Sequence, residues 1–208
     1  MQEAKIAVIY YSSTGYVYKL AEALAEGAKG TGAKVRLRRV AETAPPEVVA
    51  KNQAWQEHID QIGDRVPLVS LEDLEWADGY ALGSPTRYGN MTAQLKQFID
   101  STGGLWQQGV LSNKVATSFT SAQNQHGGLE TTILSINNTF YHWGSIIVPP
   151  GYTHQKIFDA GGNPYGASYP SGGDTDQALP AALSAARYQG FRLAKYARLL
   201  NFRQDLAD

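Results

Sequence analysis

The chain has 208 residues, of which 43% are hydrophobic and 18% are charged, and its formal net charge is −1. This size and composition predict a single globular domain, residues 1–208, with an extensive core. The near-zero charge argues against nucleic acid as a partner and against electrostatic attraction to a membrane. Because there is no cysteine, disulfides, thiolate nucleophiles, iron–sulfur clusters and Cys-based zinc sites are excluded, and no metal site is expected.

From the residues before the first apolar segment we expect no signal peptide, and no apolar run approaches the ~18 residues of a membrane-spanning helix. The sequence therefore predicts a cytoplasmic protein without membrane insertion.

The first segment has the pattern of a strand, a short polar turn and a helix. An apolar run over 6–11 stops at Ser12-Ser-Thr-Gly, and a helical pattern with Val17 and Leu20 on one face follows. Free N–H groups and the macrodipole at such a helix start favour a phosphate. The turn has no lysine and lacks the glycine spacing of a dinucleotide fingerprint, which favours a mononucleotide. Alternatively, Ser12 or Thr14 only caps the helix.

Strand and helix patterns then alternate along the chain, which predicts an α/β fold with a parallel sheet. The predicted strands are 6–11, 34–40, 79–83, 114–119 and 145–148. Helical patterns follow the first turn and residues 90 and 128, and further helical patterns cover 70–77 and 179–200. Two long segments, about 41–69 and 152–176, do not fit a minimal five-strand unit, and long loops are usually functional, interfacial or disordered.

Three polar loops follow predicted strands, at 12–17, 84–90 and 120–127. In a doubly wound sheet, ligands bind beyond the carboxyl ends of the strands. The first loop suits a phosphate. The second contains Pro85 to fix its shape, Arg87 as a cation and Tyr88 as a stacking surface, and the third suits hydrogen bonding to a flat heterocycle. Each loop alone could be a simple connection, but together they predict one ligand site.

Several motifs resemble those of a known family, in order and over almost the whole chain. They are Tyr10-Tyr-Ser-x-x-Gly, Pro85-Thr-Arg-Tyr-Gly-Asn-Met, Thr102-Gly-Gly-Leu-Trp, Val148-Pro-x-Gly-Tyr, Pro164-Tyr-Gly-Ala, Gly172-Gly-Asp and Ala186-Arg-Tyr-Gln-Gly. The sequence resembles the WrbA family of flavodoxin-like NAD(P)H:quinone oxidoreductases. That resemblance implies a doubly wound five-stranded sheet with helices on both faces, FMN as cofactor, NADH or NADPH as co-substrate, a quinone substrate and a homotetramer.

The resemblance also implies which residues contact the cofactor. The FMN phosphate would lie on Ser12, Ser13, Thr14, Gly15, Tyr16 and Val17. The isoalloxazine would be bordered by Pro85, Thr86, Arg87 and Tyr88, and its pyrimidine side would be bound by Ser121, Ala122, Gln123, Asn124 and Gln125.

Two further positions are implied to act on the substrate. The resemblance implies that His142 is a catalytic residue that reaches the flavin of a neighbouring subunit. There it would donate a hydrogen bond or a proton to the quinone oxygen. Trp106 would form an aromatic wall where substrate stacks, and Thr14 would lie on the nicotinamide side. Without the resemblance, His142 would be interpreted as a helix-end histidine and Trp106 as a core residue.

The implied reaction is a ping-pong, two-electron reduction of quinones to hydroquinones, with hydride transfer through flavin N5. Two departures from the family pattern bear on it. Ser121-Ala-Gln-Asn-Gln-His stands where the family often has Ser-Thr-Gly-Thr-Gly-Gly, and Thr14 stands at a commonly aromatic position. These departures leave flavin affinity, redox potential and nicotinamide preference open.

Two other functions remain open from the sequence. One is a flavodoxin-like electron carrier for protein partners, although such carriers generally use strongly charged surfaces for docking. The other is an interaction protein that keeps the fold with little flavin, which the altered 121–126 loop suggests.

Overall fold

The computed structural model describes residues 3–63, 65–172 and 175–204 of the chain. Its centre is a parallel sheet with the strand order β2-β1-β3-β4-β5, to which β6 is added alongside β4. The strands are β1 Lys5–Tyr10, β2 Lys34–Arg39, β3 Gly79–Pro85, β4 Val115–Ala122, β5 Ile146–Ile147 and β6 Ser168–Pro170. The predicted α/β fold and five-strand parallel sheet are confirmed, and β6 is an addition that the sequence pattern did not indicate.

Strands β5 and β6 share one edge of β4. The first pairs with β4 at Val115 and Ala116, whereas β6 pairs with it over residues 120–122. The chain between them, 148–167, leaves the sheet edge and returns to it. Gln189 ties this return to the sheet, because its Oε1 accepts from the N–H of Ala167 and its Nε2 donates to the Ser118 carbonyl.

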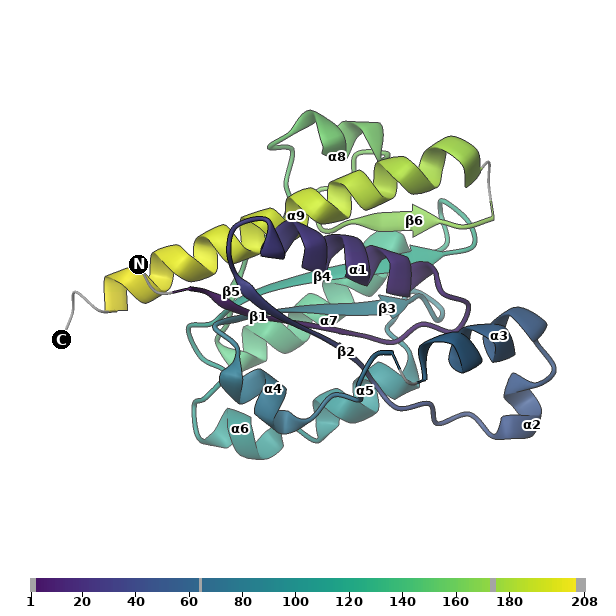
Figure 1. Ribbon diagram of the computed structural model, residues 1–208, viewed down its shortest axis with the longest axis horizontal. Coiled ribbons are helices and arrows are strands. Elements are labelled where there is room, and N and C mark those ends of the chain that lie inside the picture. Colours follow the sequence, from purple (N-terminus) through teal and green to yellow (C-terminus); the bar gives the residue numbers. More distant parts are fainter. Residues whose placement is uncertain (1–2, 64, 173–174, 205–208) are drawn as a thin grey trace.

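Helices cover both faces of the sheet, as predicted (Figure 1). They are α1 Tyr16–Lys29, α2 Pro46–Val49, α3 Gln53–Ile62, α4 Leu71–Trp76, α5 Ala93–Asp100, α6 Gly103–Gln107, α7 Leu129–Trp143, α8 Gln155–Asp159 and α9 Thr175–Gln204. One face packs against α1 and α9, and the other packs against α4, α5, α6 and α7.

The alternation of β1 explains this two-sided core. Successive side chains of a strand point to opposite faces. Ile6 and Val8 are accordingly buried in the cluster with α1 and α9, whereas Ala7 and Ile9 are buried in the cluster with α4, α5 and α7. Every side chain from Ile6 to Tyr10 is fully buried, which explains why the strand is a continuous apolar run.

Both long segments have regular structure. Residues 41–69 contain α2 and α3, which lie beyond the carboxyl ends of the strands, at the right of Figure 1. Residues 152–176 contain α8, β6 and the start of α9. Among the described residues, no helix has the length and apolarity that crossing a membrane requires.

Candidate functional site

An open cleft of about 300 Å³ lies beyond the carboxyl ends of β1, β3 and β4. Parallel pairing brings these ends together, since Tyr10 is opposite Gly83 and Pro85 is opposite Ser121. The cleft is lined by Ser13, Thr14, Tyr16, Pro85, Thr86, Arg87, Ser121, Ala122, Gln123 and Ser171. All three predicted loops therefore contribute to one cleft, as the strand pattern indicated.

The turn after β1 leaves the start of α1 open. The N-cap of this helix is Gly15, with φ of 91°, and no side chain caps the helix. Ser12 Oγ instead accepts a hydrogen bond from the Gly15 N–H at 3.0 Å and so folds the turn. Neither Ser12 nor Thr14 caps α1, so the N–H groups of its first turn can bind an anion.

Residues of this turn differ in what they offer a ligand. Ser13, Thr14 and Tyr16 line the cleft with their side chains. The side chain of Val17 is buried in the core at 1% exposure, so only its backbone can contact a ligand. The Tyr16 ring packs on the Tyr169 ring, with centroids 5.2 Å apart, which anchors the turn to β6.

The loop after β3 holds an aromatic ring in solvent. Tyr88 is fully exposed and has φ of 52°, a backbone conformation that non-glycine residues rarely adopt. Strained backbone of this kind concentrates at functional sites. The loop is closed by paired backbone hydrogen bonds between Arg87 and Asn90, at 2.8 and 3.0 Å. It therefore presents Arg87 and Tyr88 on a fixed frame.

The loops after β3 and β4 are held against each other. A Cβ placed on Gly128 would lie 2.8 Å from the Gly89 Cα, so this approach requires glycine. The Thr132 hydroxyl donates to Thr86 Oγ1 at 2.8 Å, and the Thr86 N–H donates to the Ser121 carbonyl at 2.8 Å. These contacts join both loops to the start of α7.

The third predicted loop starts later than the sequence indicated. Residues 120–122 belong to β4, and the loop proper begins at Gln123. Asn124 and Gln125 are exposed and do not line the cleft, whereas Ser121, Ala122 and Gln123 do.

Ser171 lines the cleft, although no pattern in the sequence predicted it. Its N–H and hydroxyl both contact the Ala122 carbonyl, at 2.7 and 3.2 Å. The following Gly172 N–H donates to the Gln123 carbonyl at 2.7 Å. The only available signal was the neighbouring Gly172-Gly-Asp motif, because no periodicity reveals that this segment returns to β4.

Trp106 and His142 lie in a second cleft of about 420 Å³, formed by α5, α6 and α7. The Trp106 Nε1–H donates to the His142 carbonyl at 2.8 Å, and the ring is 56% exposed. The interpretation of Trp106 as a core residue is therefore wrong. Within one chain, neither residue lines the cleft at the turn after β1.

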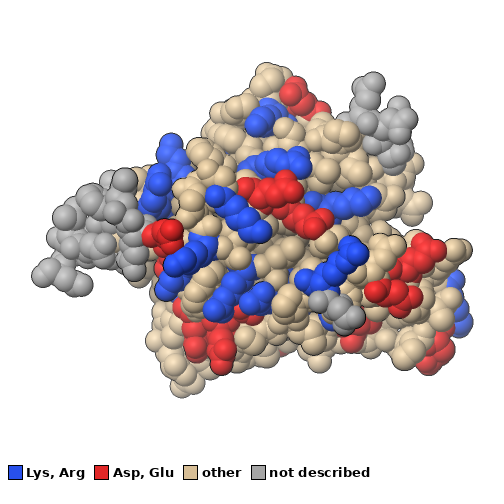
Figure 2. Space-filling view, viewed as in Figure 1, with Lys and Arg blue, Asp and Glu red and all other residues tan. Residues whose placement is uncertain are grey.

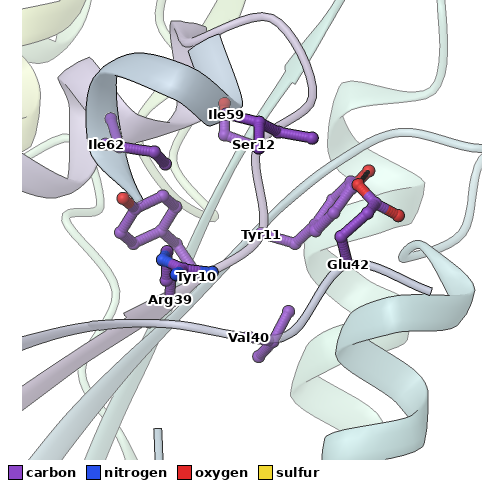
Figure 3. A pocket seen from close by; sticks show the side chains of 8 residues that line it. All are labelled: Tyr10, Tyr11, Ser12, Arg39, Val40, Glu42, Ile59 and Ile62. Carbon is purple, nitrogen blue, oxygen red and sulfur yellow. Dashed lines mark hydrogen bonds between the residues drawn. The ribbon is translucent and has the colours of Figure 1, made fainter. Parts of the chain in front are cut away.

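A third hollow, of about 40 Å³, lies behind the turn (Figure 3). Figure 3 shows Tyr11 and Glu42 side by side, with Ser12 above them and Ile59 of α3 close to Ser12. The Tyr11 hydroxyl donates to Glu42 Oε2 at 2.7 Å, and the Trp55 Nε1–H donates to the same oxygen at 3.0 Å. Glu42 thereby connects the end of β1 with α3.

The cleft offers neutral donors and one exposed cation, Arg87. Among the described residues, no group of three or more His, Asp or Glu side chains could hold a metal ion. Figure 2 shows basic and acidic side chains interspersed on the visible face, in keeping with the net charge of −1. Specific hydrogen bonding and stacking, rather than a strong field, are what this site can supply.

Fold and cleft together define a flavodoxin-like α/β protein. The WrbA-like flavodoxin from Agrobacterium tumefaciens has a similar structure, with a TM-score of 0.67 and 22% identity, covering 95% of this chain and 99% of that chain. A flavodoxin from the domain Archaea has a TM-score of 0.60 and 18% identity, covering 93% of this chain and 99% of that chain.

Sequence comparison places the chain in a family. Residues 4–157 match the family described as NADPH-dependent FMN reductase. An NAD(P)H dehydrogenase (quinone) of Deinococcus radiodurans is 48% identical, covering 81% of this chain and 84% of that protein. One of Paraburkholderia phymatum is 42% identical, covering 95% and 98%. The chain therefore belongs to the FMN reductase family, and the resemblance to WrbA proteins is confirmed.

Proposed function

We propose that this protein is an FMN-dependent NAD(P)H:quinone oxidoreductase whose cofactor lies in the cleft beyond β1, β3 and β4. One observation carries the proposal: the uncapped start of α1 opens into the same cleft as the loops after β3 and β4. A phosphate monoester fits the first feature, because free N–H groups and the helix dipole favour an anion there. A flat polar ring fits the other two loops.

Each part of the cleft has its own role in this proposal. Ser13, Thr14 and the N–H groups at the start of α1 hold the phosphate. Thr86, Arg87 and Tyr88 border the ring, and Ser121, Ala122 and Gln123, the residues of the third loop that line the cleft, hydrogen-bond its pyrimidine side. Arg87 and nearby N–H groups stabilise negative charge at the ring edge. When bound, FMN would supply the redox chemistry, a two-electron transfer from NADH or NADPH to a quinone in ping-pong order.

Substrate contacts are proposed to come from the second cleft. Trp106 offers an exposed aromatic face on which a quinone can stack. His142 is exposed at the end of α7 and can donate a proton or hydrogen bond to a quinone oxygen. Because these two residues do not line the cofactor cleft of their own chain, the proposal requires that a neighbouring subunit supply them. An unchanged quinone rate in His142→Ala would remove this role.

A homotetramer is accordingly part of the proposal. The chain exposes several large apolar side chains, among them Trp106, Tyr141, Tyr152 and Phe158. Exposed aromatic residues are enriched at protein interfaces. Light scattering coupled to size exclusion should give four times the chain mass, whereas a monomer that retains full quinone activity would contradict the need for a neighbouring subunit.

The decisive experiment follows the absorbance of the bound flavin. The protein is loaded with FMN, and NADPH or NADH is added without oxygen, followed by a benzoquinone. We expect the visible absorbance of the flavin to fall rapidly when the nicotinamide is added and to return when the quinone is added. The rates of the fall with NADPH and with NADH show which of the two the protein prefers. Bound flavin that stays oxidised would instead favour an electron carrier, and protein that takes up no FMN would favour an interaction protein.

A further inference from the structure

His58 on α3 packs directly against the turn after β1. The residue is 6% exposed, and its ring lies beside Gly15, where a Cβ would be 3.3 Å from Nδ1. On its other side the ring packs on Tyr18, with centroids 5.6 Å apart. Its Nε2 is buried and has no hydrogen-bond partner among the described residues. A buried polar atom without a partner needs an explanation.

Helix α3 is held firmly in this position. The Trp55 side chain of this helix donates a hydrogen bond to Glu42, and Glu42 also accepts a hydrogen bond from the hydroxyl of Tyr11, directly after β1. After the helix, Arg39 of β2 donates to the carbonyls of Gly63 and Val66, at 3.1 and 2.9 Å. Bonds to β1 and β2 therefore fix the helix that carries His58.

Within residues 3–63, 65–172 and 175–204, the groups that face His58 are cationic or neutral. Lys19 and Tyr18 lie on α1, and Arg39 lies on β2. On its own helix, the carboxylates of Glu57 and Asp60 are exposed and accept from Gln side chains one turn earlier. Burial, followed by the charges of Arg39 and Lys19, lowers the pKa of His58 to about 4. The imidazole is therefore neutral at pH 7 in the free protein.

We propose that His58 belongs to the phosphate site and takes up one proton from solvent when a phosphate monoester binds at residues 12–17. This inference rests on the proposed function, because it assumes that a phosphate lies at the start of α1. A phosphate dianion beside Gly15 adds negative charge near His58, where Arg39 and Lys19 are the charged groups that act on it among the described residues, and this favours the imidazolium. The protonated ring carries an N–H on both nitrogens, and the positive charge strengthens its attraction to the phosphate.

Calorimetry tests this directly. FMN is titrated into the FMN-free full-length protein between about pH 5 and 7, in pairs of buffers with different ionisation enthalpies. We expect the wild type to take up as much as one more proton per FMN than His58→Gln. Its FMN affinity relative to that variant should rise by up to tenfold per pH unit as the pH falls. Riboflavin, which lacks the phosphate, should show no such difference.

His154→Gln is the matched control, because His154 is an exposed histidine at the start of α8. It should bind FMN with the proton count of the wild type. Equal proton counts in wild type and His58→Gln, with FMN bound by both, would overturn the inference and leave the proposed function standing. If the wild type binds no FMN, both proposals fail.

An NMR titration covers the case in which His58→Gln does not fold. The pKa of the His58 ring is measured in the wild type, first free and then loaded with FMN. We expect FMN to raise this pKa by at least one unit, and an unchanged value would overturn the inference.

Discussion

Glu42 and His58 are two ionisable side chains near the end of β1 in opposite electrostatic settings. Burial would raise the pKa of Glu42, but donors from Ala44, Tyr11, Gln94 and Thr43 outweigh it and lower the pKa. His58 has no such compensation, since it is buried next to cations and its Nε2 has no hydrogen-bond partner in the part of the chain that the structure describes. Glu42 is therefore stabilised as a carboxylate, whereas His58 is stabilised as the neutral ring.

His58 should make the stability of the free protein depend on pH. The unfolded chain binds a proton at this residue below about pH 6.5, but the folded protein does so only below about 4. Between these values the unfolded state holds more protons, so the free energy of unfolding falls as the pH falls. The lowered pKa predicts a loss of about 3 kcal/mol from pH 7 to below pH 4.

Denaturant unfolding of wild type and His58→Leu across this range measures the effect. In the variant, the free energy of unfolding should still fall with pH because carboxylates become protonated, but the further loss that His58 causes should be absent. Parallel stability curves for the two proteins would contradict the lowered pKa of His58.

At the scale of elements, α1 and α9 approach each other through a pair of glycines. A Cβ on Gly27 would lie 1.8 Å from the Arg187 carbonyl oxygen, and one on Gly190 would lie 1.9 Å from the Leu24 carbonyl oxygen. Both contacts are with backbone, which cannot rotate away as a side chain can. Glycine is required at both positions, and the contact fixes how α9 covers the sheet.

Gly190→Ala should therefore force α1 and α9 apart. Overpacking a well-packed contact typically lowers stability by about 1–3 kcal/mol, and a backbone clash belongs at the upper end. Gly104→Ala in α6 is the matched control, because its Cβ would meet nothing within 4 Å. That change should leave stability unchanged or raise it by up to about 1 kcal/mol. Chemical unfolding measures these stabilities. A Gly190→Ala variant with the same free energy of unfolding as the wild type would contradict the close contact between α1 and α9.

At the scale of the whole molecule, segments far apart in the sequence meet at the carboxyl ends of the strands. The turn after β1, the loops after β3 and β4, and Ser171 form the cleft, while α3 supports the turn from behind. Figure 1 shows the carboxyl ends of the strands and α3 at the same end of the sheet, at the right of the view. A ligand there contacts several elements at once, so binding and global stability should be coupled.

FMN should therefore raise the thermal midpoint of the protein. At about 100 times its dissociation constant, a ligand that binds only the folded state adds about 2.7 kcal/mol. For a chain of this size, that corresponds to an increase of roughly 5–11 °C. Calorimetric scans at one fixed protein concentration measure it, with riboflavin at equal concentration expected to give a smaller shift. A midpoint unaffected by FMN would contradict a cofactor site in this cleft.

Local patterns in the sequence determined most of the fold. The alternating strand and helix patterns predicted the parallel sheet and its covered faces, because side-chain periodicity is set by backbone geometry. Placing three polar loops at the carboxyl ends of strands predicted a shared cleft, and the cleft is present. The family motifs added the roles of particular residues in binding FMN and the substrate, and all of these roles stay predictions.

Only the tertiary structure decided the non-local contacts. Ser171 enters the cleft because β6 pairs with the end of β4, a pairing between segments 48 residues apart that leaves no periodic signal. His58 meets Gly15 because Glu42 and Arg39 hold α3 and the chain after it against β1 and β2. Such contacts depend on how elements pack rather than on the pattern within any one element, so periodicity cannot reveal them.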